Sequence, residues 1–385
     1  MIDFNKKIDR NNNDSRKWDG IEKDFGKKDV FPMWVADMDL ECPEFVVEAL
    51  KNKADQKIFG YTMEKDEYFE SLINWVKRRH GYTLDRKKMA HSPTVITSLN
   101  LVINMITEVG DNILIQTPTY PQFVKQIEKN NREVLENKLI ETENSYEIDF
   151  IDFEEKLKKS KVFILCNPHN PSGRVWKKEE LEQIANLCVK YNVKLISDEI
   201  HSDLILDGKH LSVATLNDEI KRITYTFLSS TKTFNLAGLQ SSFAIFPTVE
   251  EKIEFVDRLS MVGVHEPNSF CMDMVISAYN NGDEWLGELL DHIRGNIEFA
   301  IDYINENLPK MKVKTPEATY LLWLDFRGYN LTDEEINENL VERGGLGLNM
   351  GIPFMGSGFA RMNIACPRYM LEEGLKRLKV AMNNC

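Results

Sequence analysis

The sequence has no apolar run that approaches the roughly 20 residues of a membrane-spanning helix. Basic residues are also in deficit, because 48 Lys and Arg stand against 61 Asp and Glu, which gives a net charge of −13. Nucleic-acid phosphates bind clusters of Lys and Arg, and the sequence has no such excess. We therefore expect neither a membrane nor a nucleic acid among the partners.

Several familiar motifs are missing too. There is no GxGxxG after a first strand, no Walker loop, no GxSxG elbow and no HExxH, and the seven histidines show no metal-ligand spacing. No metal is expected. The N-terminal segment MIDFNKKIDRNNND has no apolar signal-peptide core. Six scattered cysteines without a CxxC pair are typical of reduced thiols, so the cytoplasm is the expected location: 42, 166, 188, 271, 366 and 385.

The chain does contain a regular alternation of strand and helix patterns. Short, nearly all-apolar runs are typical of strands buried on both faces: NILIQTP, KVFILCNP, VKLISDE, RITYTFL and SFAIF. Amphipathic stretches such as KKEELEQIANLCVKYN separate several of these runs, which predicts βαβ units and a mainly parallel sheet. Two helix patterns end at glycines, one at Gly81 and one at Gly110.

The pattern changes after about Glu284. A long helix, DEWLGELLDHIRGNIEFAIDYINENL, is followed by the strand TYLLWLDF, a helix near Thr332, the strand ARMNIA and a terminal helix. With 385 residues the chain is long enough for two domains. We expect an N-terminal arm with part of a small domain over 1–45, a large domain over 46–284, and a small α+β domain over 285–385.

Three polar motifs follow apolar runs, where parallel strands bring ligands together at their carboxyl ends. They are CNPHNPSG with Asn170, ISDEIHSD with Asp198, and SSTKTFNLAGL with Lys232. A lysine for a Schiff base, a carboxylate for the pyridine nitrogen and an amide for the ring hydroxyl are the groups that a pyridoxal phosphate (PLP) enzyme requires. The alternatives are a surface lysine, a helix-capping Asp198, and a turn residue at Asn170.

These motifs occur together with PMWVADMDL from Pro32, IFGYT from Ile58 and FARMNIACPR from Phe359. In this order they resemble the fold-type I aminotransferase superfamily and, within it, the carbon–sulfur β-lyases of the MalY/PatB type. The resemblance runs from about Asp14 to near the C-terminus. It implies an α/β fold with a seven-stranded, mainly parallel sheet, PLP as the cofactor, and a homodimer with shared active sites.

The resemblance also implies roles for single residues in holding the cofactor: stacking on the ring by Tyr120, contact with the ring oxygen by His201, phosphate contacts from the backbone amides of Val95 and Ile96 and from the hydroxyl of Ser229, and a phosphate contact from Tyr61 of the neighbouring subunit. Tyr120 has core packing as its alternative, and His201 has a structural role. The chain departs from the family pattern at Thr94, where glycine is usual.

For the substrate, the resemblance implies that Arg361 binds the α-carboxylate, with Tyr120 and main-chain groups near Ala36 in the Trp34–Asp39 loop assisting. A strand-edge salt bridge is the alternative for Arg361. The sequence shows no second arginine in a recognisable position for a side-chain carboxylate. The expected reaction is α,β-elimination from L-cystathionine, L-cysteine or another S-substituted cysteine, with Lys232 removing the α-proton, to give a thiol, pyruvate and ammonia. An aminotransferase and a PLP-binding regulator of a transcription activator are the alternatives.

Overall fold

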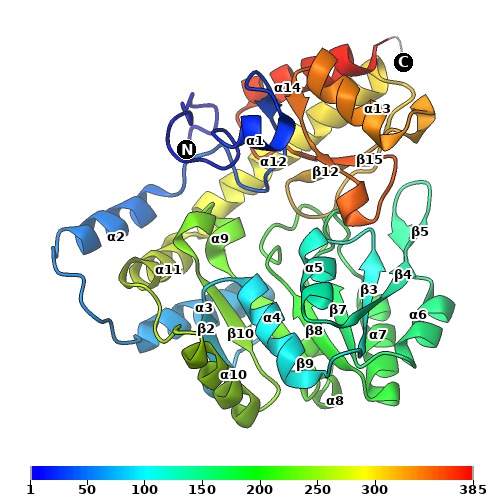
Figure 1. Ribbon diagram of the computed structural model, residues 1–385. Helices are drawn as coiled ribbons and strands as arrows, with labels where there is room; N and C mark the ends of the chain where they lie inside the picture. Colours follow the sequence, from blue (N-terminus) through cyan, green and yellow to red (C-terminus); the bar gives the residue numbers. More distant parts are fainter. Residues whose placement is uncertain (1, 384–385) are drawn as a thin grey trace.

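The computed structural model describes residues 2–383, and within them a seven-stranded sheet forms the centre of the larger part of the molecule (Figure 1). Its strand order is β2-β10-β9-β8-β7-β3-β4. Strand β10 runs antiparallel to both of its neighbours, and the other neighbouring pairs are parallel. The prediction of a mainly parallel sheet is confirmed. The strands are β2 Met89–Ser92, β3 Asn112–Thr117, β4 Glu133–Lys138, β7 Val162–Cys166, β8 Lys194–Asp198, β9 Thr224–Leu228 and β10 Ser242–Ile245.

Helices cover both faces of this sheet. Successive residues of a strand point to opposite faces, so each strand packs against helices on both sides. In β7, Ile164 packs in one core cluster with α4, α5 and α10, and Phe163 packs in another with α6 and α7. Strands buried on both faces must be apolar throughout, which explains the runs in the sequence. The helices of this part are α2 Glu44–Ala54, α3 Asp66–His80, α4 Val95–Ile106, α5 Pro121–Lys129, α6 Phe150–Leu157, α7 Lys178–Tyr191, α8 Asp218–Lys221, α9 Ser230–Thr233, α10 Val249–Met261 and α11 Ser269–Asn281.

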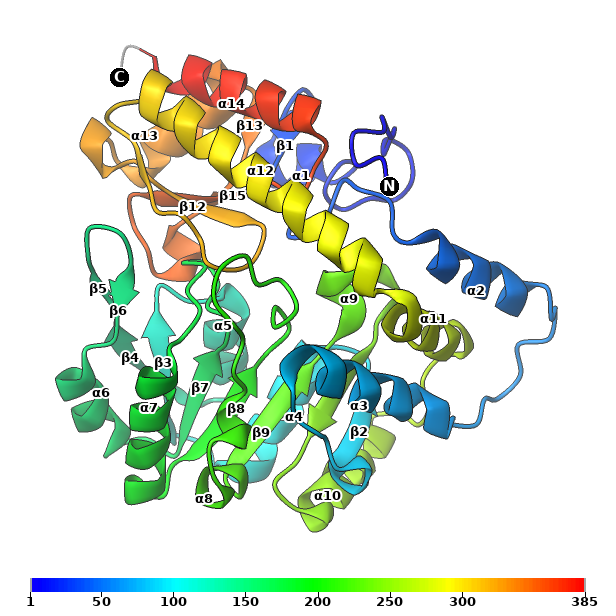
Figure 2. The ribbon, with the colours of Figure 1, turned by 180° about the vertical axis from the view of Figure 1, so that it is seen from behind.

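A second, four-stranded sheet lies beside the long helix α12, which runs along α14 (Figure 2). This sheet has the order β11-β12-β15-β14 within the described chain. A parallel pair, β1 with β13, joins the N-terminal segment to this region, and β5 and β6 form a small separate hairpin. The elements are α1 Ile21–Phe25, β1 Phe31–Pro32, β5 Ile140–Glu141, β6 Tyr146–Glu147, α12 Asp283–Asn307, β11 Lys312–Val313, β12 Leu321–Asp325, α13 Asp333–Glu338, β13 Leu346–Gly347, β14 Asn349–Met350, β15 Phe359–Asn363 and α14 Arg368–Met382.

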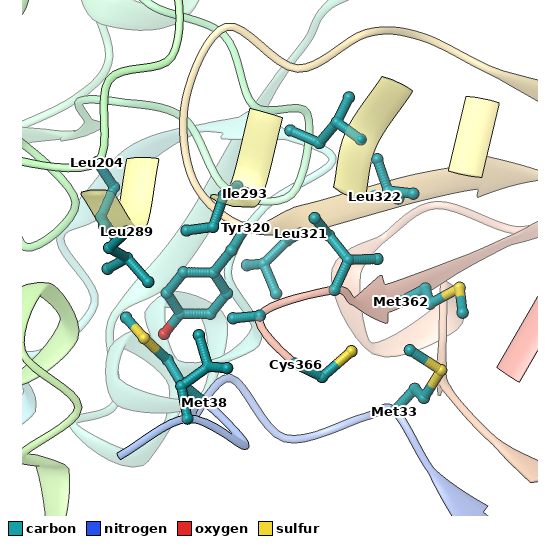
Figure 3. Close-up of a cluster of buried hydrophobic side chains, with 14 of the residues drawn as sticks. Met33, Met38, Leu204, Leu289, Ile293, Tyr320, Leu321, Leu322, Met362 and Cys366 are labelled. Atoms are coloured by element: carbon teal, nitrogen blue, oxygen red, sulfur yellow. The ribbon is translucent and has the colours of Figure 1, made fainter. Parts of the chain in front are cut away.

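One core cluster connects the N-terminal arm to the small sheet and to α12 (Figure 3). Met33 and Met38 of the arm lie in it with Leu289 of α12, Leu322 of β12 and Met362 of β15. Each of these side chains is at most 1% exposed, so the arm is packed into the molecule and does not hang free. The arm and the C-terminal elements therefore share one core.

One predicted helix end is wrong. Gly81 does end α3, in the left-handed conformation with φ 76°, but α4 ends at Ile106, well before Gly110. Thr107 leaves the helix with φ −137°, and its carbonyl oxygen accepts from Arg132 Nη2 at 2.6 Å. The guanidinium thus donates to a carbonyl oxygen that a further helical turn would otherwise have paired, so no glycine is needed to end the helix.

None of the helices within residues 2–383 combines the length and the apolar character needed to cross a bilayer.

Candidate active site

A cleft of about 390 Å³ opens at the carboxyl ends of β7 and β8, between the large sheet and the small one. It brings together residues that are up to 345 positions apart in the chain, from Arg16 to Arg361. Ten of the predicted site residues line it, namely Ala36, Val95, Ile96, Tyr120, Asn170, Asp198, His201, Ser229, Lys232 and Arg361. Tyr61 lies outside the cleft and is fully exposed, so its predicted contact across a subunit boundary stays a prediction.

Lys232 is placed by the short helix α9, which follows β9 directly and is capped by Ser229. Its side chain is half-buried, and its ammonium donates to the carbonyl oxygen of Ala36. Burial lowers the pKa of Lys232 to about 8, and the positive charge of Arg361 acts in the same direction. A lysine amine in this cleft therefore loses its proton far more readily than one in water, which suits a nucleophile or a base.

Asp198 is the last residue of β8 and is buried. Burial raises the pKa of its carboxyl group to about 7, although Oδ1 accepts the backbone N–H of Ile200 at 3.1 Å. That contact fits the alternative reading as a local cap. The high pKa shows, however, that this contact does not compensate for the buried charge. A cationic group in the cleft would provide the missing partner.

Asn170 and Arg361 hold each other in the cleft. Arg361 Nη1 donates to Asn170 Oδ1 at 3.0 Å, and both residues are buried. The amide oxygen is thus occupied, which leaves the Asn170 NH₂ group free to donate. Arg361 Nε has no hydrogen-bond partner within the described chain, and burial lowers the pKa of the guanidinium to about 10. Arg361 forms no strand-edge salt bridge among the described residues. The Nε–H group of Arg361 is therefore suited to donate a hydrogen bond to an anion.

His201 and Tyr120 form aromatic parts of the wall. His201 Nδ1 is buried without a hydrogen-bond partner among residues 2–383, and burial lowers the pKa of this imidazole to about 3. A neutral ring with an unpaired nitrogen at the cleft points to a ligand contact more than to a satisfied core histidine. Tyr120 caps α5, and its ring packs edge-on against Phe123 with centroids 5.7 Å apart.

The N-terminus of α4 forms another part of the wall. Val95 and Ile96 begin this helix, and their backbone N–H groups have no intrahelical acceptor, so they are suited to bind an anion. Thr94 precedes them in extended conformation, φ −146°, and its hydroxyl accepts from Thr97 N at 3.0 Å. No positive φ is required here. Threonine therefore replaces the usual glycine without distorting the loop.

Ser229 also lines the cleft, but its hydroxyl is already engaged. Its Oγ donates to the carbonyl oxygen of Ser241 at 2.6 Å and accepts from Thr231 N at 3.1 Å. The hydroxyl has one proton, so it must rotate away from Ser241 before it can donate to an anion. Thr231, which also lines the cleft, is a second hydroxyl near this point.

The Trp34–Asp39 loop closes one side of the cleft through its backbone. Ala36 O accepts from Tyr320 Oη at 3.0 Å as well as from Lys232. Asparagine side chains hold the loop on both flanks: Asn363 Nδ2 donates to Val35 O at 2.6 Å, and Asn349 Nδ2 donates to Trp34 O at 2.5 Å. These amide contacts come from β15 and β14 and fix the loop to the small sheet.

Sequence reasoning missed three of these contributors. Tyr320 and Asn349 carried no motif, and only their position across the cleft shows their use. Asn363 was visible two residues after Arg361 in FARMNIACPR, where period two puts both on one face of the strand. The structure also puts Arg16 on the cleft wall, where the sequence indicated no second arginine.

The donor and acceptor set fits pyridoxal phosphate. Among residues 2–383, the buried carboxylate of Asp198 forms no ion pair, the imidazole of His201 has a nitrogen without a hydrogen-bond partner, and the first amides of α4 have no intrahelical acceptor and suit a phosphate. Lys232 supplies an amine of lowered pKa beside them. Each polar part of that cofactor thus meets a complementary group, and no charge in the set opposes it.

Comparison with known proteins agrees with this chemistry. The profile described as "Aminotransferase class I and II" matches residues 28–378. Cystathionine beta-lyase PatB of Bacillus subtilis is 40% identical, over 99% of this chain and 100% of its own. A protein of Clostridium difficile 630, solved with PLP bound and described as a candidate aminotransferase, is 46% identical, covers 100% of both chains and has a TM-score of 0.98.

A PLP-bound C–S lyase of Staphylococcus hominis is 31% identical, with 100% of this chain and 99% of its own covered and a TM-score of 0.92. The predicted fold, seven-stranded sheet included, is therefore confirmed. The family profile covers well over half of the sequence and includes the cleft residues from Trp34 to Arg361. The chain belongs to the aminotransferase class I and II family and has its fold-type I architecture.

Proposed function

We propose that this chain is a PLP-dependent carbon–sulfur β-lyase acting on L-cystathionine, L-cysteine or a related S-substituted cysteine. The observation that carries the proposal is that two groups line the same cleft: the amine of Lys232, whose pKa is lowered, and the guanidinium of Arg361, whose Nε has no hydrogen-bond partner among the described residues. Together they accommodate an α-amino acid with its carboxylate on the arginine. The names of the relatives, cystathionine beta-lyase and C–S lyase, favour elimination over transamination.

The proposal assigns tasks to several residues of the cleft. Bound PLP supplies an electron-accepting ring that makes the α-hydrogen of an amino acid acidic. Asp198 would keep the proton on the ring nitrogen, and Asn170 and His201 would donate to the ring oxygen. The amides of Val95 and Ile96 would hold the phosphate at the N-terminus of α4.

The substrate is positioned by Arg361 and deprotonated by Lys232. The planar guanidinium binds both oxygens of the α-carboxylate and so sets the direction of the α-hydrogen. The neutral amine of Lys232 takes that proton, and the carbon–sulfur bond then breaks with its electron pair going to sulfur. For cystathionine the net change is the consumption of one water and the release of homocysteine, pyruvate and ammonia.

One assay tests the proposal. Purified protein with PLP should release pyruvate from L-cystathionine in stoichiometric amounts with homocysteine, and no oxo acid should be required as an acceptor. A lactate dehydrogenase coupled assay measures the pyruvate, and a thiol reagent measures the homocysteine. Activity that appears only when an oxo acid is added would instead identify an aminotransferase.

The proposal extends to the assembly, and we propose a homodimer with shared sites. Apolar side chains are exposed in the single chain at Ile58, Phe59, Tyr61 and Met63. The segment is anchored by Thr62, whose Oγ1 donates to Pro267 O at 3.0 Å. Such a patch is unfavourable in water and is typical of an interface. Tyr61 would then reach the phosphate site of the second copy.

Subunit mixing checks this assembly. Tyr61→Ala and Lys232→Ala are each expected to be nearly inactive, because one loses a phosphate contact and the other loses the base. When the two are mixed, hybrid dimers contain one site with neither substitution, so about a quarter of the wild-type activity should return. Mass spectrometry of differently tagged subunits establishes that exchange took place. Exchange without recovered activity would contradict a shared site.

Two further features are part of the proposal. We propose the division into an arm with part of the small domain over 1–45, a large domain over 46–284 and a small domain over 285–385. The two separate sheets support it. We propose the cytoplasm as the location, because the cysteines within residues 2–383 are all free thiols. Cys385 lies outside the described residues.

A further inference from the structure

A second arginine, Arg16, contributes to the wall of the cleft from the N-terminal arm. Among the described residues that line the cleft, and apart from His201, four have an acidic or basic side chain: Asp198, Lys232, Arg361 and Arg16. The first three have tasks in the proposed reaction. Arg16 has none, although it brings a permanent positive charge to the cleft of a protein whose net charge is −13.

The backbone around Arg16 is held in one conformation. The carboxylate of Asp19 accepts three backbone N–H groups, from Asn12 at 2.8 Å and from Asn13 and Ser15 at 3.0 Å each. A carboxylate that gathers three amides from one short segment fixes that segment as a tight loop. Arg16 follows directly, so its Cα has little freedom to move away from the cleft.

The next residue anchors the same segment in the interior. Lys17 is 1% exposed and forms an ion pair with Asp39, which is 3% exposed. Trp18 Nε1 donates to Asp39 at 2.8 Å, and Arg10 Nη1 donates to it at 2.7 Å. Removing one partner of a buried charge pair is costly, so this network holds the arm firmly against the Trp34–Asp39 loop.

Trp34 then supplies the surface on which the Arg16 side chain lies. The guanidinium carbon is 5.5 Å from the centroid of the Trp34 ring, and this indole lines the cleft itself. Trp34 Nε1 donates to Lys17 O at 3.1 Å, which ties the ring to the arm. An arginine stacked on an indole keeps its in-plane N–H groups free for a ligand.

The present partner of Arg16 is easily exchanged. Arg16 Nη2 lies 3.1 Å from Asp24 Oδ1, and the Arg16 side chain is 68% exposed. Exposed ion pairs contribute little to stability. A carboxylate that enters the cleft can therefore replace Asp24 on one edge of the guanidinium without a large loss of stability.

We propose that Arg16 binds a carboxylate at the far end of the sulfur substituent of the substrate. The proposal rests on the function proposed above and narrows it. The preferred substrates are S-substituted cysteines whose substituent ends in a carboxylate, and L-cystathionine belongs to this class. Arg361 binds the α-carboxylate and Arg16 the distal one, so the two arginines select a substrate with an anionic group at each end.

Three substrates and one substitution test this assignment in the PLP-loaded enzyme. L-Cystathionine and S-(3-carboxypropyl)-L-cysteine both end in a carboxylate, and S-butyl-L-cysteine has the same length without one. For Arg16→Gln we expect kcat/KM to fall about 10- to 100-fold on the first two, since a charge-assisted hydrogen bond is lost. The loss should lie mainly in KM, because the contact is remote from the reacting atoms. On S-butyl-L-cysteine the change should stay within about threefold.

Two other substitutions calibrate the result. Arg361→Lys should lower kcat/KM for all three substrates to a similar degree, because each has the α-carboxylate. Arg258→Gln removes another surface arginine, one paired with Glu254 on α10, and should change none of them. Calorimetry of L-cystathionine binding in a Lys232→Ala background, with and without Arg16→Gln, gives the same comparison without turnover.

The outcomes are distinct. If Arg16→Gln affects the three substrates equally, or affects none, Arg16 does not bind the distal carboxylate and the inference is wrong, while the lyase function stands. If the wild-type enzyme releases pyruvate from none of them, the proposed function fails and the inference fails with it. If L-cystathionine alone suffers and S-(3-carboxypropyl)-L-cysteine does not, the distal carboxylate is not what Arg16 binds, and the assignment is overturned.

Discussion

Lys232→Ala is expected to lower pyruvate release from L-cystathionine by at least about a thousandfold. In the proposed function the amine of Lys232 is the base in the cleft, and proton transfer by a placed group contributes about 10²–10⁴-fold to a rate. The substitution would also remove the group proposed to bond covalently to the cofactor. The protein should remain folded, because the side chain only lines the cleft and its one described hydrogen bond goes to Ala36 O.

The site of attachment is measured directly. Borohydride reduction of the loaded protein followed by peptide mapping should place the label on Lys232, and label on another lysine would overturn the assignment. Lys159→Ala, at an exposed position, is the matched control and should react as wild type. Attachment needs the neutral amine, whose pKa is about 8 in the cleft. The rate of covalent loading should therefore rise with pH, reach half of its maximum near pH 8 and level off well above it.

Asp198→Asn is expected to lower kcat by about 10²–10³-fold while leaving part of the cofactor binding intact. A neutral amide cannot stabilise a protonated ring nitrogen, and loss of one placed electrostatic partner has effects of this size. Asp291→Asn, at an exposed position on α12, is the control and should leave kcat unchanged. A near-normal rate in Asp198→Asn would show that another group protonates the ring.

Stability separates the catalytic role of Asp198 from a structural one. Burial raises its pKa to about 7 in the folded protein, above the 3.8 of an ordinary aspartate, so the folded state binds more protons than the unfolded state. This carboxyl group therefore destabilises the cofactor-free protein increasingly as the pH rises from about 4 to 7, and by a constant amount above. At pH 8 the cofactor-free Asp198→Asn protein should melt no lower than wild type in calorimetry.

Much of the fold was predictable because local patterns and burial agree. Strands such as Val162–Cys166 are apolar throughout, and this signal survives in the sequence because both faces of the sheet are covered. The end of α4 was not predictable. It depends on Arg132, which reaches the Thr107 carbonyl from 25 residues away, and such a contact leaves no periodic trace.

The candidate site divides in the same way. Asn170, Asp198 and Lys232 were recognisable because each lies at or just after the carboxyl end of a strand, and parallel strands deliver these ends to one edge. Their shifted pKa values were only roughly foreseeable. The lowering at Lys232 depends on burial and on Arg361, which stands 129 positions away in the chain.

The sequence by itself determined the alternation of apolar strands and amphipathic helices, the family and the candidate residues whose types suit the chemistry, since these follow from local composition and motif. Only the tertiary structure decided that Arg16 lines the cleft and that Ala36 accepts from Lys232. The physical reason is that an irregular arm has no periodicity of its own. Its conformation comes from the buried ion pair of Lys17 with Asp39 and from packing against the small sheet, and both exist only once the chain has folded.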